Sequence, residues 1–283
     1  MTAPRYIKGL SEIADGFDAL LCDAWGVVHN GVEPLGSAPD AMAEFRDRCG
    51  PIVIITNAPR PGSIITAQLD RIGVRRDAWD AIATSGDATR AAIAAHLPGA
   101  AFRLGPDKDD ALYEGLDVAF APVDAADFIV CTGLFDETGE APDDYRPLLT
   151  AAAARGLPMV CANPDVVVRW GDKLVWCAGA LADLYQSLGG AVVYGGKPHP
   201  PIYDLAVAAA ERAAGRPLDR SRILAVGDGV KTDILGARRN GLPALYVAGA
   251  GGVHDGDQDE QAVIAALATE GADAAYWSTE LAW

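Results

Sequence analysis

Apolar runs that end in a polar residue recur along the chain and predict buried parallel strands. Residues 19–22 are followed by Asp23, residues 52–55 by Thr56 and Asn57, and residues 223–226 by Gly227 and Asp228. A short apolar run without polar alternation is typical of a strand that is covered on both faces. Because open α/β sheets bind their ligands at the carboxyl ends of their strands, we expect these polar residues to share one site.

Strand-like runs alternate with helical segments at both ends of the chain. In the first part we expect strands at 19–23 and 52–56 and helices at 38–48 and 61–72. In the last part we expect strands at 191–194, 223–227 and 244–248 and helices at 200–214 and 231–240. Alternation of this kind predicts an α/β fold with a doubly wound parallel sheet.

The middle of the chain separates these two parts and has elements of its own. We expect strands at 127–131 and 159–161 and helices at 87–96 and 144–154. A segment of this length is itself the size of a domain. The sequence therefore predicts a discontinuous core domain of residues 1–80 plus 191–283 and an inserted domain of residues 81–190.

Composition excludes several classes of function. The chain has 283 residues, 50% hydrophobic and 22% charged, which is typical of a globular protein. Its net charge of −16 argues against nucleic-acid binding, which needs clustered Lys and Arg. It has neither an apolar run of about 18 residues, which a membrane span needs, nor the pattern of a signal peptide. Its five cysteines are widely spaced and include no Cys-x-x-Cys, so we expect free thiols and a cytoplasmic protein.

The polar residues at the strand ends suit a divalent metal ion and a phosphoryl group. Carboxylates supply hard oxygen ligands, and a Thr hydroxyl donates to phosphoryl oxygens. Lys197 lies between Gly196 and Pro198 just before an expected helix start, where an anion site is favoured. A lone Asp after a strand is more often a turn residue or a helix cap, so the prediction depends on the full set.

Taken in order, these motifs resemble those of the haloacid dehalogenase superfamily of aspartate-nucleophile phosphatases. The motifs are Asp23-x-x-Gly26-Val27, Thr56-Asn57, Gly196-Lys197-Pro198 and Gly227-Asp228-Gly229-Val230-Lys231-Thr232-Asp233. The segment Ala162-Asn163-Pro164-Asp165, and Tyr203 after the Gly-Lys-Pro motif, are most similar to the class IIA branch of nucleotide and sugar phosphatases. The resemblance implies a haloacid dehalogenase-like, Rossmannoid core and an inserted α/β type-2 cap that covers the active site and selects the substrate.

The resemblance also implies a role for each residue. Asp23 would be the nucleophile that forms an aspartyl phosphate, and Thr56, the backbone around Asn57, and Lys197 would bind the phosphoryl group. Mg²⁺ would be held by Asp23, Asp228 and the backbone carbonyl of Trp25. Asp233 would either ligate the metal through water or orient Asp228 and Lys197. Asn163, Asp165 and the loop 132–135 would contact the substrate.

These roles predict a magnesium-dependent phosphatase of a small phosphorylated metabolite, either a sugar phosphate or a nucleotide. Members of the branch are often dimeric through the cap, so a homodimer is the partner that the resemblance implies.

Trp25 departs from the pattern of the superfamily. The residue two positions after the nucleophile is usually a second aspartate, which protonates the leaving group and later activates water. An indole cannot exchange protons near neutral pH, and general acid–base help is worth about 10²–10⁴ in rate. Three readings remain open: His29 substitutes as the acid–base group, the substrate has a leaving group that needs no proton, or the protein binds phosphate esters as a weak enzyme or regulator.

Overall fold

The largest of three sheets is built from seven parallel strands, in the order β1-β13-β12-β11-β2-β3-β4. This computed structural model describes residues 3–170, 173–249 and 259–283. The strands are β1 (Arg5–Tyr6), β2 (Ala19–Asp23), β3 (Ile52–Thr56), β4 (Ala81–Thr84), β11 (Ile223–Gly227), β12 (Ala244–Val247) and β13 (Tyr276–Ser278). The three strands that were predicted to end at the site, β2, β3 and β11, are neighbours in this sheet.

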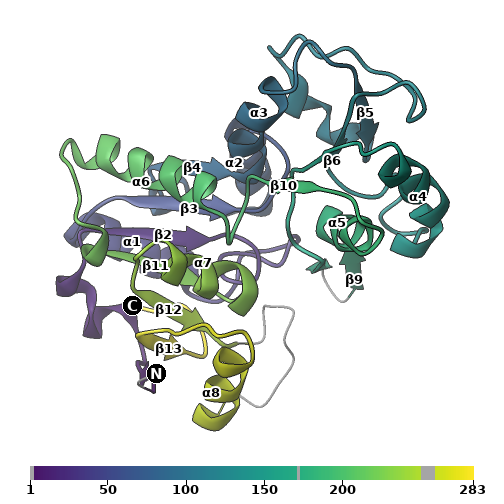
Figure 1. Ribbon diagram of the computed structural model, residues 1–283. Helices are drawn as coiled ribbons and strands as arrows, with labels where there is room; N and C mark the ends of the chain where they lie inside the picture. Colours follow the sequence, from purple (N-terminus) through teal and green to yellow (C-terminus); the bar gives the residue numbers. More distant parts are fainter. Residues whose placement is uncertain (1–2, 171–172, 250–258) are drawn as a thin grey trace.

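Helices cover both faces of this sheet (Figure 1). They are α1 (Ala38–Arg48) and α2 (Gly62–Ile72) on one face, and α6 (Pro200–Ala214), α7 (Leu235–Arg239) and α8 (Glu260–Thr269) on the other. Strand β2 shows why both layers form. Its Leu20 belongs to the core cluster that contains Phe45 of α1, whereas Leu21 belongs to the cluster that contains Tyr203 of α6. Because successive side chains of a strand point to opposite faces, an uninterrupted apolar run needs a helical layer on each side.

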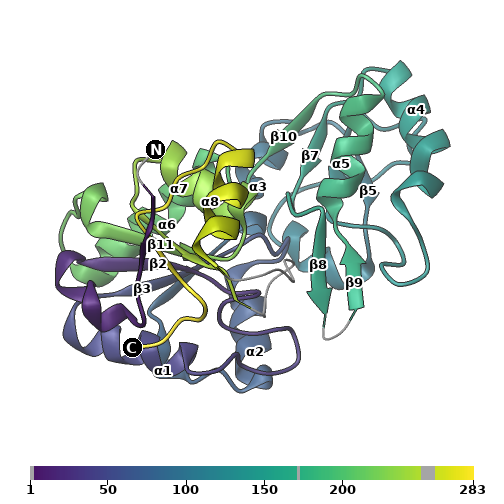
Figure 2. The same ribbon diagram turned by 90° about the horizontal axis from the view of Figure 1, so that it is seen from below.

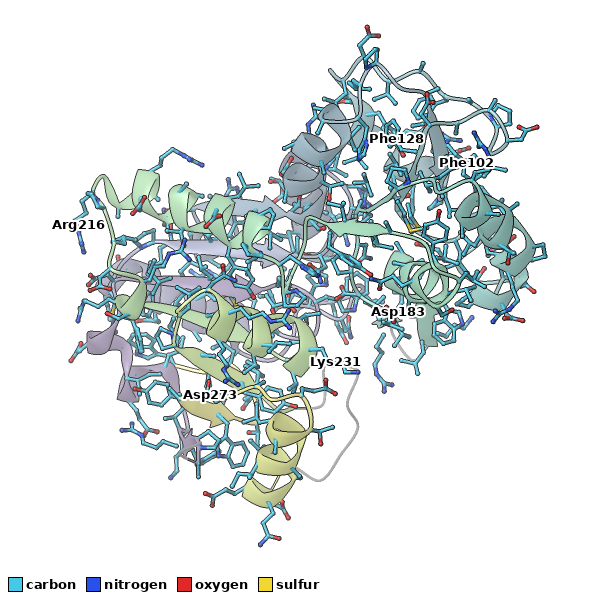
Figure 3. The ribbon with its side chains drawn as sticks, in the orientation of Figure 1. Phe102, Phe128, Asp183, Arg216, Lys231 and Asp273 are labelled. Carbon is cyan, nitrogen blue, oxygen red and sulfur yellow. The ribbon has the colours of Figure 1, made fainter. Side chains whose placement is uncertain are left out.

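A second parallel sheet, in the order β10-β7-β6-β5, forms the core of the inserted domain. Its strands are β5 (Ala101–Leu104), β6 (Phe128–Cys131), β7 (Met159–Cys161) and β10 (Val192–Tyr194), and the accompanying helices are α3 (Ser85–Ala94), α4 (Arg146–Ala154) and α5 (Ala178–Ser187). Leu149 of α4 and Tyr185 of α5 pack in one core cluster, and Ile93 of α3 packs in another with Phe128. Figure 3 shows Phe102 and Phe128 within this domain, far from Arg216 at the opposite end of the core.

Two strands lie outside both of these sheets. β8 (Val167–Trp170) and β9 (Lys173–Trp176) pair with each other in antiparallel register and form a separate ribbon on the inserted domain (Figure 2). The shorter helical turns are η1 (Leu10–Glu12), η2 (Ala14–Gly16), η3 (Arg76–Ala78), η4 (Asp107–Tyr113), η5 (Pro142–Tyr145), η6 (Arg220–Arg222) and the π-helical η7 (Val230–Ile234). Among the residues that the structure describes, none of the helices has the length and apolar character needed to cross a lipid bilayer.

The predicted α/β fold, a doubly wound core with an inserted α/β domain, is confirmed, but one predicted strand joins a different sheet from the one expected. The segment predicted as a core strand at 191–194 forms β10, which pairs with β7 of the inserted domain. Conversely, residues 81–84, for which no strand was predicted and which were assigned to the inserted domain, form β4 and pair with β3 of the core. Apolar, β-branched residues predict that a strand forms, but the partner strand depends on tertiary packing that a local pattern does not encode.

Candidate active site

The carboxyl ends of three adjacent strands bring the predicted polar residues together. Asp23 is the last residue of β2, where it lies opposite Ile55 of β3, and Asp228 directly follows β11 on the other side. Gly26 lets the loop after β2 approach Asp228 closely. Its φ is +84°, and a Cβ atom there would lie 2.2 Å from the Asp228 Oδ2. This position therefore requires a glycine both for its backbone conformation and for space.

Lys197 joins two of the acidic residues in a buried ion cluster. Its Nζ lies 2.6 Å from the Asp23 Oδ1 and 2.7 Å from the Asp233 Oδ1. All three residues are nearly inaccessible, with exposed fractions of 2% for Lys197, 6% for Asp23 and 4% for Asp233. The Asp233 Oδ2 accepts hydrogen bonds from the Gly229 N–H (3.1 Å) and the Thr232 hydroxyl (3.2 Å). Both oxygens of Asp233 are thus held by the chain, an arrangement that favours its predicted role in orienting Lys197.

The acidic side chains of this site need a further cation to balance their negative charge. Asp23, Asp228 and Asp233 each offer a carboxylate oxygen, and these atoms all lie within 4.8 Å of one another. Burial raises the pKa of Asp23 to about 7, with a further contribution from the Asp233 charge, and burial also raises the pKa of Asp228 well above its ordinary value. One ammonium group cannot balance three ionised carboxylates, and uncompensated buried charge is costly. Clustered hard oxygen donors fit Mg²⁺, which would supply the missing positive charge.

Asn57 fastens the Lys197 loop to the core. Its Oδ1 accepts a hydrogen bond from the Lys197 N–H at 2.7 Å, and its Nδ2 donates to the Asp165 Oδ1 at 2.8 Å. Gly196 allows this close approach, because a Cβ atom there would lie 2.5 Å from the Asn57 Oδ1. The phosphoryl contact predicted for Asn57 is one made by its backbone, and its side chain is occupied in positioning Lys197 and the segment around Asp165.

A cavity of about 400 Å³ lies between the core and the inserted domain. Five of the predicted site residues are part of its wall, namely Trp25, Thr56, Thr132, Asn163 and Asp165. The cavity is also lined by Gly31, Arg60, Arg71, Lys108, Asp109, Glu137, Val168, Trp170 and Val175. Farther along the junction, Asp183 of α5 and Lys231 of the core interact electrostatically (Figure 3).

The charged side chains of the cavity are largely paired. The Arg60 Nε lies 3.4 Å from the Asp109 Oδ1, and Lys108 forms an ion pair with Glu137. Burial raises the pKa of Asp109 to about 6, although the positive charge of Arg60 acts in the opposite direction. Arg60 and Asp109 were not among the predicted site residues. They lie on the core and the inserted domain, and nothing in either local pattern indicates the contact.

His29 has the environment of a structural residue. Its exposed fraction is 2%, and its Nδ1 accepts a hydrogen bond from the Gly31 N–H at 2.9 Å. Burial lowers its pKa to about 4, so the ring is neutral near neutral pH and carries no proton that a leaving group could readily take. We therefore do not propose His29 as the substitute acid.

The side chain of Trp25 projects toward the inserted domain. Its Nε1 donates a hydrogen bond to the carbonyl oxygen of Arg169 in β8 at 2.5 Å, and the residue lines the cavity. The ribbon that contains Arg169 was also missed, although two β-prone runs separated by Gly171 and Asp172 are a hairpin signal.

Comparisons with known proteins agree with this architecture. The family model described as haloacid dehalogenase-like hydrolase matches residues 20–119, and a second model of haloacid dehalogenase-like hydrolases matches residues 194–270. The crystal structure of a hydrolase of the haloacid dehalogenase-like family from Brucella suis 1330 is 42% identical, with a TM-score of 0.89. That match covers 97% of this chain and 99% of the other.

Two further matches concern a phosphatase of Mycobacterium tuberculosis (strain ATCC 25618 / H37Rv). D-glycerol 3-phosphate phosphatase from this organism is 29% identical over 245 residues, which is 84% of this chain and only 65% of that relative's length. The crystal structure of glycerol phosphate phosphatase from M. tuberculosis in complex with magnesium is 26% identical with a TM-score of 0.62, and covers 88% of this chain and 72% of the other. The family models and the near full-length match to the Brucella structure show that the chain belongs to the haloacid dehalogenase-like hydrolase superfamily.

Proposed function

We propose that this protein is a magnesium-dependent phosphatase of small phosphorylated metabolites that acts through an aspartyl phosphate on Asp23. The observation that carries the proposal is the buried Lys197–Asp23 ion pair, which lies with Asp228 at three adjacent strand ends. Phosphoryl transfer demands positioning and charge neutralisation more than covalent chemistry from the protein. This cluster supplies a carboxylate nucleophile and a fixed cation within one hydrogen-bond length of each other.

Hydrogen bonds leave one oxygen of Asp23 for the reaction. The Oδ1 accepts from the Ala24 N–H at 2.7 Å and contacts the Lys197 Nζ at 2.6 Å. The Oδ2 would attack phosphorus, forming an acyl phosphate as the bond to the ester oxygen breaks. Water would then hydrolyse the acyl phosphate, releasing inorganic phosphate and restoring the carboxylate. Lys197 would neutralise charge on the nucleophile and the phosphoryl oxygens, and Thr56 in the cavity wall would donate its hydroxyl to them.

The metal site would consist of carboxylates and one backbone oxygen. Asp23, Asp228 and the carbonyl of Trp25 would hold Mg²⁺, and Asp233 would keep Lys197 in place beside it. When bound, the ion supplies positive charge to the phosphoryl oxygens. The magnesium complex of the glycerol phosphate phosphatase relative supports this choice of ion.

The cavity favours a phosphomonoester with a small uncharged remainder. Its volume of about 400 Å³ is modest, and two of its three cations, Arg60 and Lys108, are already paired with Asp109 and Glu137, whereas the third, Arg71, is exposed. A second phosphate group that used Arg60 or Lys108 would have to compete with these partners. Asn163, Asp165 and Thr132 supply polar atoms that suit hydroxyl groups. Together with the likeness to a D-glycerol 3-phosphate phosphatase, this favours a polyol or sugar phosphate over a nucleotide.

One observation favours a second function, that of a weakly active phosphate-ester-binding or regulatory protein. Trp25 occupies the position of the usual acid, and its indole N–H is hydrogen-bonded to Arg169 instead of facing a leaving group. Binding needs only the phosphoryl and metal groups, whereas efficient turnover of an alkyl phosphate also needs a proton donor.

Phosphate release by the purified protein separates the two functions. We expect release from glycerol phosphates and small sugar phosphates that requires Mg²⁺ and stops when the metal is chelated. Nucleoside monophosphates should be poorer substrates, because their bulk exceeds that of a polyol. Acyl phosphates should be turned over most readily, since their leaving groups need no proton. Thermal stabilisation by Mg²⁺ and a phosphorylated ligand, without release from any compound, would support the binding protein.

Magnesium affinity is expected to fall as the solution becomes more acidic. The metal needs the ionised carboxylate, and the pKa of Asp23 is raised to about 7, so a proton competes with the ion below that pH. Each competing proton lowers the apparent affinity by up to about tenfold per pH unit. Calorimetric titration with Mg²⁺ at about pH 6 and about pH 8 checks this, and Asp23→Asn should flatten the dependence. Equal affinities at the two pH values would contradict it.

A further inference from the structure

Trp25 is a direct link between the catalytic loop and the inserted domain. The indole Nε1 donates to the backbone carbonyl of Arg169, a residue 144 positions farther along the chain. The distance is 2.5 Å, and the acceptor lies in β8 of the two-stranded ribbon. Trp25 lies two positions after the proposed nucleophile Asp23, and its side chain therefore contacts a different domain.

The same contact is reinforced by close packing on Gly31. A Cβ atom at Gly31 would lie 2.7 Å from the Trp25 Cζ2 and 3.0 Å from the Trp170 Cδ1. Gly31 has a φ of +89°, and its N–H is held by the Nδ1 of the buried His29. Gly31 thus lies against the indole of Trp25 from the core and the indole of Trp170 from the ribbon. The rings of Trp25 and His29 also pack against each other in an edge arrangement.

Within its own sheet, the ribbon has no third described strand to stabilise it. β8 and β9 pair only with each other among the described strands, and a two-stranded hairpin alone is marginally stable in water. One face of the ribbon lines the cavity through Val168 and Val175, which lie opposite each other in register. The other face exposes Leu174 (58%) and Trp176 (41%). The position of this cavity wall therefore depends on contacts that the ribbon makes with the core.

We propose that Trp25 is a positioning residue whose indole holds the β8–β9 ribbon against the catalytic loop and so fixes one wall of the cavity that Trp25 and Thr56 also line. The position that usually carries a proton donor is then used to join the two domains. This inference goes beyond the proposed function, because it concerns the place of the ribbon and holds whether or not the protein releases phosphate.

Hydrogen exchange of Trp25→Phe tests the inference without any assay of activity. Phe keeps an aromatic ring but removes the N–H, and loss of one hydrogen bond should speed exchange in the ribbon by about 2- to 10-fold. The increase should be confined to residues 167–170, 173–176 and the loop around Gly31. Trp277→Phe is the matched control, because within the described residues the buried Nε1 of Trp277 has no hydrogen-bond partner.

A second variant covers the case in which Trp25→Phe folds poorly. Trp170→Ala removes the ribbon's indole beside Gly31 but keeps the backbone carbonyl of Arg169, and the side chain is 50% exposed, so the fold should tolerate it. It should speed exchange at the same residues, but by less than Trp25→Phe does. Unchanged exchange of the ribbon in Trp25→Phe, or a uniform increase that matches the Trp277→Phe control, would overturn the inference, and so would unchanged exchange in Trp170→Ala if Trp25→Phe does not fold.

Kinetics add a readout that a merely structural residue would not move. If phosphate release is confirmed, Trp25→Phe should raise KM by about 2- to 10-fold with a smaller change in kcat, because the ribbon must be ordered again when substrate binds. The Trp277→Phe control should leave both constants near those of the parent. An equal loss of kcat in both variants, with KM unchanged, would contradict a positioning role while leaving the proposed phosphatase activity intact.

Discussion

Asp23→Asn is expected to abolish phosphate release while leaving the fold in place. The amide keeps an oxygen that accepts from the Ala24 N–H and contacts Lys197, but it cannot form an acyl phosphate. Loss of a covalent nucleophile should lower kcat by about 10⁴-fold or more. In the absence of metal, the variant should be at least as stable as the parent at neutral pH and above, because it removes one of three clustered carboxylates.

A carboxylate elsewhere in the core provides the matched control. Asp18 pairs with Arg222 at 2.8 Å and directly precedes β2, at the opposite end of the strand from Asp23. Asp18→Asn removes the same charge and should retain the parent kcat. Mass spectrometry of rapidly quenched parent protein should also detect an added phosphoryl group that Asp23→Asn lacks. Comparable release by the two variants would exclude Asp23 as the nucleophile.

The central part of the site was predictable because it depends on strand ends. Asp23, Thr56 and Asp228 each follow an apolar run, and parallel strands place their carboxyl ends along one edge of the sheet. Local patterns also predicted α1 and α6 at their observed bounds. These features follow from short-range chemistry, in which a buried strand must be apolar and a ligand edge must be polar.

The walls of the site were not predictable, since they arise from contacts between distant segments. The partners of Asn57 lie at Asp165 and Lys197, and the partner of Trp25 lies at Arg169. Each of these pairs depends on how the inserted domain packs on the core. The family resemblance identified several of these residues. Only the three-dimensional arrangement indicates that the Asn57 side chain positions other groups and that Trp25 binds the ribbon.

Trp25→Asp is expected to raise kcat for phosphate esters that have poor leaving groups. A carboxylic acid at this position could protonate the departing alkoxide and then accept a proton from the attacking water, whereas an indole can do neither. We expect a gain of about 10²-fold for glycerol phosphate and little gain for acyl or nitrophenyl phosphates, which leave without a proton. The dependence of the rate on leaving-group pKa should therefore become shallower in the variant.

The matched control for this gain is Trp25→Asn. Asn has nearly the size of Asp and loses the same contact with Arg169, so both variants should show the rise in KM that follows release of the ribbon. Only Asp can exchange a proton near neutral pH, so the ratio of the two kcat values isolates the contribution of the acid from the cost of the lost contact. A ratio near one for glycerol phosphate would mean that proton transfer to the leaving group does not limit the rate. The natural substrate would then be expected to have a leaving group that departs without a proton.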